Sequence, residues 1–316
     1  MATASSSETL SAVAPKTAGN RLLVLFCFLS IYLIWGSTYL AIRYAVETIP
    51  PLYTAGFRQI TAGTILLLWA LARGLRPTWA QIRASAVIGF FFFLIGHGSV
   101  HWAEKVVPSG LAALLIAVEP IVVFLLTSLA ARTWRLNGWL LLGILMGLAG
   151  VGLLVRDTTL AATPGLTLGS VAILIGAVSW SIGIIYSRRS HLSGNPLLLS
   201  ALSLLSGAVM LLIAGTAVGE AKGLSVSQVS TRSWVSLAYL IVFGSVIAFT
   251  AYNWLLEHYS PTLVATHTYV NPVVAVLLGW AYGGETLTPR VALAAGLVVA
   301  AVVLVDRGTN RLRGLA

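Results

Sequence analysis

Two stretches of this 316-residue chain share a pattern that decides its fold. Residues 111–126 read LAALLIAVEPIVVFLL, and residues 263–278 read LVATHTYVNPVVAVLL. At a constant offset of 152 positions, Pro120 aligns with Pro272, and several Leu, Val and Ala positions align around them. Since matches among Leu, Val and Ala arise easily by chance, the shared prolines carry the weight of the comparison.

Tryptophans extend the same relation beyond these stretches. The offset that aligns the prolines also places Trp102 on Trp254. With a slightly different offset, which a change in loop length explains, Trp35 in IWGSTY faces Trp180 in SWSIGIIY. The chain is therefore predicted to contain an internal repeat.

The amino-acid composition distinguishes a membrane protein from a soluble one. Hydrophobic residues make up 58% of the chain, charged residues only 9%, and the mean hydropathy is +0.93. Soluble domains carry about 25% charged residues, so an integral membrane protein is expected. Nineteen basic and nine acidic residues give a net charge of +10. Because charged residues are so few, we expect the basic ones to determine the orientation of the protein in the bilayer, and we do not expect nucleic-acid binding. The single cysteine, Cys27, excludes an internal disulfide and a cysteine-based zinc cluster.

The apolar runs have the length of membrane spans. A hydrocarbon core about 30 Å thick needs roughly 20 residues of helix. Cutting the chain at its charges gives ten such runs: Leu22 to Ile42, Pro51 to Ala72, Ala84 to Ala103, Ser109 to Ala131, Leu136 to Val155, Leu166 to Ser187, Pro196 to Gly219, Ser233 to Leu256, Pro261 to Gly283 and Thr286 to Val305. An all-α membrane protein with ten transmembrane helices is predicted.

The basic residues predict the orientation of these helices. With the N-terminus inside, the cytoplasmic segments hold twelve Lys and Arg residues and the opposite segments hold six. Both termini are therefore expected in the cytoplasm, at the inner (plasma) membrane. Residues 1–21 are predicted to form a disordered cytoplasmic tail, 22–156 a first five-helix repeat, 166–307 a second, and 308–316 a further cytoplasmic tail.

An odd number of spans in each repeat has a topological consequence. Two similar five-helix halves must lie in the membrane upside down relative to each other. Inverted repeats enclosing a site near the bilayer midplane are typical of secondary transporters, which alternate between inward-open and outward-open states. The sequence alone thus favours a transporter.

At this point the chain resembles the EamA-type transporters of the drug/metabolite transporter superfamily. The resemblance covers Leu22 to Arg307 and includes the Trp-Gly of the first span, the prolines of the fourth and ninth spans, and the ending GGETLTPRVALAAGLVVAAVVLV at residues 283–305. The first repeat departs from the motif, with Thr133 where the second has Glu285. The resemblance implies export of small metabolites, commonly amino acids, across a bacterial inner membrane. Aromatic amino-acid exporters are one such identity, for which no residue is diagnostic.

Two charged side chains within spans are candidates for a substrate site. Glu119 lies near the predicted midplane, and Arg58 lies roughly 10 Å into its helix. Such residues are costly in lipid and usually face a cavity or a partner. A pair between them would reduce both desolvation costs and could act as a gate. A static ion pair, or Arg58 reaching outward to the interface, are the alternatives.

Polar side chains in the third and ninth spans extend this set. His97 and His101 share a helix face, and Glu104 follows close to the membrane surface. The segment HGSVH lacks the acid that a zinc hydrolase places between its histidines, so lining of a wet pathway, proton exchange or packing are favoured over metal binding. His267 and Asn271 are also four residues apart, and Asn271 aligns with Glu119 through the repeat.

Aromatic residues within the spans are candidates for lining a pocket, with packing or lipid contact as the alternative for each. They are Trp35, Tyr39, Trp102, Trp180, Tyr186, Tyr252 and Tyr269.

The leading hypothesis is a secondary transporter of a small, partly apolar metabolite. Arg58 would attract a substrate carboxylate, and Glu119 would balance an amino group or carry a coupling proton. A broad xenobiotic exporter is the main rival. An intramembrane enzyme and a channel are disfavoured, because the chain has no recognisable nucleophile, metal motif or polar filter. The expected partners are a small-molecule substrate and the lipid bilayer, with no cofactor and no metal; the oligomeric state is not fixed by the sequence.

Overall fold

The computed structural model describes residues 21–132, 137–155, 163–190, 195–259, 264 and 266–313. Every regular element within these ranges is a helix, which confirms the predicted all-α fold. The predicted disordered tail lies outside the described residues except for Arg21, and so does Thr133.

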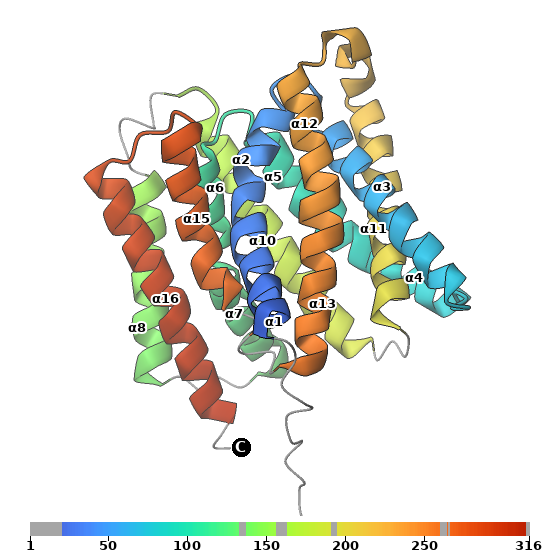
Figure 1. Cartoon of the computed structure of the whole chain (residues 1–316). Coiled ribbons are helices and arrows are strands. Elements are labelled where there is room, and N and C mark those ends of the chain that lie inside the picture. Colours follow the sequence, from blue (N-terminus) through green and yellow to red (C-terminus); the bar gives the residue numbers. More distant parts are fainter. Residues whose placement is uncertain are drawn as a thin grey trace, which may run out of the picture.

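The elements follow one another as helical rods that cross the molecule in alternating directions (Figure 1). The first half contains α1 (Arg21–Leu29), the π-helix η1 (Ser30–Ile34), α2 (Trp35–Ala45), α3 (Pro51–Ala72), α4 (Trp79–Gly89), the π-helix η2 (Phe90–His97), α5 (Gly98–Ala103), α6 (Ser109–Ile116), α7 (Glu119–Ala131) and α8 (Gly138–Val155). The second half contains α10 (Leu166–Arg189), α11 (Pro196–Ala217), the short η3 (Glu220–Gly223) and η4 (Val226–Gln228), α12 (Thr231–Tyr239), the π-helix η5 (Leu240–Ile247), α13 (Ala248–His258), α15 (His267–Tyr282) and α16 (Pro289–Arg313).

Eight helical segments in the described ranges are long and apolar enough to cross a membrane, with 21 to 25 residues each. Two further helices are shorter: the apolar Gly138–Leu153 within α8, and α15 with 16 residues. The structure therefore gives an integral membrane protein by helix length and composition. At the C-terminal end, α16 continues through residues 308–313, for which the sequence predicts a cytoplasmic tail.

Local sequence explains where several helices begin and where one is interrupted. Thr78 and Gln81 form a capping box that starts α4 earlier than the predicted Ala84. The predicted fourth span is divided into α6 and α7 by a turn at Ala117 and Val118. The turn lies directly before Pro120 in the first turn of α7, where the missing N–H of proline is tolerated.

Three π-helices leave backbone carbonyls that the regular helix pattern does not satisfy, and side chains from the other half of the chain bind them. Lipid offers no water to such groups, so an internal donor is required. The donors are Asn271 to the carbonyls of Ile31 and Tyr32 in η1 at 3.2 and 3.1 Å in the amide orientation that satisfies it, Ser179 to Phe91 in η2 at 2.8 Å, and Trp35 to Gly244 in η5 at 3.0 Å.

Helices of the two halves pack against each other throughout. α3 lies along α11 on one side of the molecule, α8 lies along α16 on the other, and α2, α6, α10 and α15 lie between these pairs (Figure 1). The start of α1 and the end of α16 lie at the same, lower edge in this view. Small residues permit the closest approaches, as in α8, where a Cβ added at Gly143 would lie 2.8 Å from Val305 and 2.9 Å from the carbonyl oxygen of Ala301.

Replacement of Gly143 by leucine is expected to destabilise the protein by separating α8 from α16. Overpacking of this kind typically costs about 1–3 kcal/mol. The matched control is Gly152→Leu in the same helix, where an added Cβ meets nothing within 4 Å. Thermal unfolding in detergent should give a lower Tm for Gly143→Leu than for Gly152→Leu, and equal values would contradict the packing described.

Candidate functional site

Arg58 is a buried cation in the interior of the helix bundle. It lies on α3 with 6% of its surface exposed, and its Nε donates to Ser245 Oγ in η5 at 3.0 Å. Within the described part of the chain this is its one hydrogen bond. Gly244 leaves room for the guanidinium, since a Cβ there would lie 3.3 Å from Nη2. The two terminal nitrogens therefore keep their donor capacity for a ligand.

The predicted ion pair between Arg58 and Glu119 is not formed. The ion pairs between described residues are Arg43 with Glu285 and Arg232 with Glu47. Glu119 is instead the first residue of α7, at the interruption of the fourth predicted span, where the helix dipole favours a carboxylate. Both Arg58 and Glu119 act electrostatically on Tyr39 of α2, so the three side chains belong to one interior region even though the two charges do not touch.

The histidines of the third predicted span continue this region. Gln59 on α3 hydrogen-bonds His97 Nδ1 at 2.6 Å, and His101 Nδ1 bonds the carbonyl oxygen of His97 at 2.8 Å. The His97 ring stacks on Trp180 of α10, with centroids 5.2 Å apart, and on His101. No group of three or more potential metal ligands occurs among the residues described.

Glu104, directly after α5, is a site residue that the sequence suggested least. Only 2% of it is exposed, and neither carboxylate oxygen has a hydrogen-bond partner. The backbone N–H of Arg43 acts on it electrostatically without reaching hydrogen-bonding geometry. Burial raises the pKa of Glu104 well above its ordinary value, and the negative charge of Glu285 adds to this shift, while Arg43 and Arg58 oppose it. The sequence alone places Glu104 close to the membrane surface and gives no sign of its burial.

A second aromatic group lies between α2, α13 and α15. The rings of Trp35 and Tyr252 have centroids 5.2 Å apart, and His267 packs against both. Asn271, predicted to face the same chamber, instead donates hydrogen bonds from its side-chain amide to the backbone carbonyls of η1.

Two of the predicted pocket aromatics lie apart from these groups. Tyr269 interacts with Asp306 of α16. Trp102 is 42% exposed and makes no ring contact with another residue in the described ranges. The structure thus does not bring either of them to Arg58, because their side chains leave the helices in other directions.

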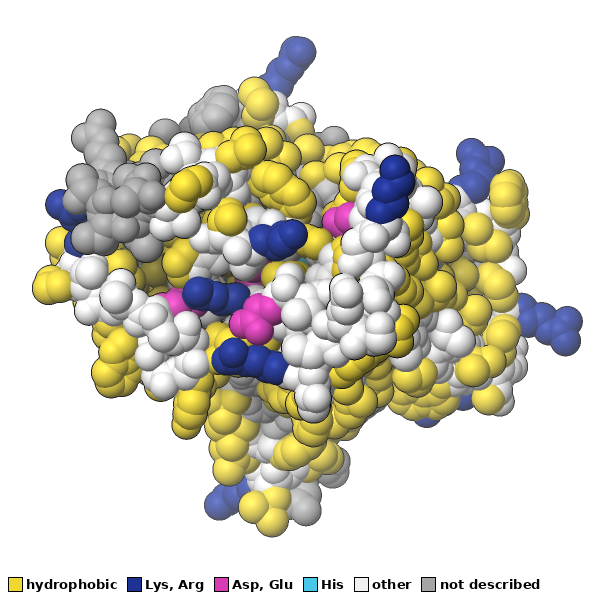
Figure 2. Space-filling model, turned by 90° about the horizontal axis from the view of Figure 1, so that it is seen from above, with side chains coloured by type: hydrophobic (Ala, Val, Ile, Leu, Met, Phe, Trp, Pro, Cys, Tyr) yellow, Lys and Arg dark blue, Asp and Glu magenta, His cyan; other side chains and the backbone are white. Residues whose placement is uncertain are grey.

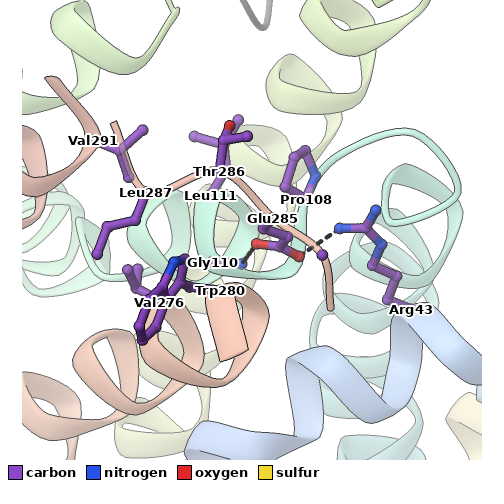
Figure 3. Close-up of a pocket in the computed structure, with 11 residues that line it drawn as sticks. Arg43, Pro108, Gly110, Leu111, Val276, Trp280, Glu285, Thr286, Leu287 and Val291 are labelled. Atoms are coloured by element: carbon purple, nitrogen blue, oxygen red, sulfur yellow. Dashed lines mark hydrogen bonds and ion pairs between the residues drawn. The ribbon is translucent and has the colours of Figure 1, made fainter. Parts of the chain in front are cut away.

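The upper face carries a network centred on Glu285, in the connection between α15 and α16. Its Oε1 accepts from Arg43 of α2 and from the N–H and Oγ of Ser109 at 2.6 and 2.7 Å, and its Oε2 accepts from the N–H of Gly110 at 3.0 Å. The carboxylate thereby caps the N-terminus of α6 beside a cavity of about 180 Å³, with Trp280 and Val291 on its wall (Figure 3). We call Glu285, Arg43, Ser109 and Gly110 the upper latch.

The upper face is hollowed where the charges meet. Acidic side chains gather near its middle, with Lys and Arg side chains around them, and apolar side chains cover most of the flanks (Figure 2). A second acid acts there in the same way as Glu285, since Glu220 accepts from the N–H groups of Leu52 and Tyr53 at the start of α3. Loops of the second half therefore fasten helices of the first half on this face.

Comparison with known proteins identifies the family of the chain. The EamA-like transporter family matches the chain twice, over residues 22–156 and 167–306. A protein of Escherichia coli (strain K12), described as the uncharacterized inner membrane transporter YedA, is 40% identical over 292 residues, which cover 92% of each chain. The uncharacterized transporter YvbV of Bacillus subtilis (strain 168) is 26% identical over 301 residues, again 92% of each. A crystal structure with 23% sequence identity and a TM-score of 0.63 covers 93% of this chain and 99% of the other, which shows the fold.

The substitution Glu104→Gln is expected to stabilise the ligand-free protein increasingly as the pH rises. A carboxyl group whose pKa is raised in the folded state loses stability as the pH rises from its unfolded pKa towards its folded pKa, and glutamine carries no such penalty. Thermal unfolding between pH 5 and 9 should give a Tm difference that is smallest at acid pH and favours the variant at alkaline pH. The control Glu47→Gln, on an exposed carboxylate, should show no such trend. A variant less stable than the wild type at alkaline pH would contradict the burial of an unpaired acid.

Proposed function

The chain belongs to the EamA-like transporter family, and we propose that it exports small metabolites, amino acids among them, by alternating access around a chamber between two inverted halves. Family membership makes it a multi-pass transporter of the inner membrane and not an enzyme. The substrate class, the inverted repeat and the direction of transport are the proposed parts.

The proposal of ten spans in two inverted repeats is supported by matching packing in the two halves. In the repeat, α3 corresponds to α11 and α8 to α16, and the members of each corresponding pair pack against each other. Likewise α2 corresponds to α10 and α15 to α6, and the contact between α2 and α15 has its counterpart in the contact between α10 and α6. The π-helices η2 and η5 interrupt the third and the eighth helical rod at related positions. Trp35 contacts Tyr252 in the eighth rod, as Trp180 contacts His97 in the third. Each half begins at one edge of the bundle and ends at the other (Figure 1).

The proposed orientation places both termini in the cytoplasm and the upper latch on the outer face. It rests on the excess of basic residues in the segments at the lower edge, where α1 begins and α16 ends.

The observation that carries the substrate proposal is the guanidinium of Arg58, buried in the bundle with its terminal donors unused. A buried cation in a membrane protein requires an anionic partner, and a substrate carboxylate supplies one. Trp180 with His97, and Trp35 with Tyr252 and His267, provide apolar and aromatic surfaces for the remainder of the molecule. Glu119, at the interrupted helix, remains a candidate for carrying a coupling proton.

The latch fits one of the two gates that alternating access requires. It ties α2 and α6 to the connection between α15 and α16 through one carboxylate. The related position of the first repeat is Thr133, which has no charge, so the sequence provides no counterpart of the Glu285 carboxylate in that repeat. We therefore assign the Arg43–Glu285 pair to the outer gate.

A broad xenobiotic exporter is the second candidate, because the same aromatic groups would hold drug-like molecules. Purified protein in liposomes tests both functions. Liposomes preloaded with a panel of amino acids and of neutral or cationic aromatic drugs should release amino acids faster than protein-free liposomes. Release of drugs alone would favour the rival, and release of neither would reject export. An imposed pH gradient tests coupling, and an unchanged rate would remove the proton role of Glu119.

Substitution of Glu285 by glutamine is expected to open the outer gate. The probe is a cysteine at Thr38, which is 7% exposed and lies near Gly244 and Arg58, in a background with Cys27 replaced by serine. Loss of about 1.4 kcal/mol from the latch corresponds to a tenfold population shift, so labelling by a membrane-impermeant maleimide from outside the cell should accelerate about tenfold. Glu47→Gln, which removes the partner of Arg232, should leave the rate unchanged. Equal labelling in all three proteins would contradict the assignment.

A further inference from the structure

Three buried side-chain atoms in the described ranges lack any hydrogen-bond partner, and all three lie on one short stretch. They are Nε2 of His101 and both carboxylate oxygens of Glu104. His101 is 0% exposed and Glu104 is 2% exposed. Since the two residues are three positions apart at the end of α5, they share a side of the helix.

All three atoms act as acceptors when Glu104 is ionised. His101 Nδ1 lies 2.8 Å from the carbonyl oxygen of His97, which cannot donate, so Nδ1 carries the proton and Nε2 is left with a lone pair. The carboxylate oxygens of Glu104 accept hydrogen bonds when ionised. A buried acceptor without a donor costs free energy, so this stretch matches a ligand that brings several N–H donors.

Unused hydrogen-bond donors lie in the same interior region, on Arg58. Arg58 uses Nε on Ser245 and has no other hydrogen bond in the described part of the chain, which leaves the donors of Nη1 and Nη2. Arg58 and Glu104 act on each other electrostatically, and both act on Tyr39. They do not reach ion-pair distance, so the unused donors and the unused acceptors do not satisfy one another.

We propose that Glu104, His101 and Arg58 bind the charged head group of an amino acid, with Glu104 and His101 accepting from its ammonium group and Arg58 donating to its carboxylate. An ammonium group offers three N–H donors to the orphan acceptors, and a carboxylate accepts from the planar fork of a guanidinium. The head group would thus satisfy both groups, which the protein does not pair with each other. This inference rests on the proposed function, and it assigns the ammonium contact to Glu104 in place of Glu119.

Position and chemistry together set the specificity of this site. Arg58 alone would accept any carboxylate, and Glu104 alone would accept any cation. A molecule that lacks either charge leaves one buried group uncompensated, which is the strongest source of discrimination between similar substrates. The site therefore selects zwitterions over monocarboxylates and over amines.

Transport in liposomes tests the assignment with three forms of one amino acid. For an amino acid that the wild type moves, the N-acetyl derivative lacks the ammonium and the methyl ester lacks the carboxylate. The wild type should move the amino acid at least about tenfold faster than either derivative, since a hydrogen bond to a charged group is lost. In Glu104→Gln the preference over the N-acetyl form should fall about tenfold, and in Arg58→Gln the preference over the ester should fall likewise. Glu104→Asp, which keeps the carboxylate, should retain part of the preference, and Glu47→Gln should retain all of it.

A binding measurement separates this role from a structural one. Saturating amino acid should raise the Tm of the wild type and of Glu47→Gln but not that of Glu104→Gln, while the ligand-free Tm of Glu104→Gln should equal or exceed that of the wild type. The assignment is overturned if Glu104→Gln keeps its preference over the N-acetyl form, if it loses all three forms equally, or if Glu119→Gln alone loses the preference. A wild type that moves no amino acid rejects the proposed function itself, whereas preserved amino-acid transport with unaltered selectivity in Glu104→Gln rejects only this inference.

Discussion

The requirement that buried polar groups find partners inside lipid organises this molecule. Each π-helix frees carbonyls in the middle of a span, and a side chain from the other half of the chain meets them, as Trp35 does for η5 and Ser179 for η2. Neither half could satisfy its own backbone alone. The halves are therefore joined by a few hydrogen bonds within a contact surface that is otherwise apolar and held by van der Waals packing.

The buried polar groups that lack a partner within the protein identify the candidate substrate site. Arg58 retains unused donors, and His101 and Glu104 retain unused acceptors, although all three side chains are buried. Packing alone would have selected apolar side chains at these positions, because an unpaired buried charge costs several kcal/mol. The retention of both signs at neighbouring positions, without direct contact between them, is explained by a ligand that carries both complementary charges.

The sequence was sufficient for the features that depend on composition and period. Apolar runs were enough to predict an all-helical membrane protein, and the position of Arg58 within one of them made it a candidate; in the structure its side chain is buried. The directions in which individual side chains point could not be predicted from the sequence. Trp102 follows the same apolar pattern as Trp180 yet lies on the outside, and Asn271 bonds to a π-helix that no apolar pattern reveals. Glu104 ends an apolar run, where the sequence indicates only a position near the membrane surface, but its side chain is buried and unpartnered within the fold.

Glu104 connects the latch with the buried site through electrostatics. The charges of Glu285 and Arg43 act on it from the latch, and Arg58 acts on it from within the bundle. A cationic group bound at Glu104 would cancel the repulsion between the two carboxylates, while an empty ionised site would weaken the hold of Glu285 on its partners. By linkage, any ligand that favours one gate state must be bound more tightly in that state. Occupancy of the site and closure of the outer gate are thus coupled through a single carboxylate, because a bound cationic group favours the closed latch and an empty ionised site favours its opening.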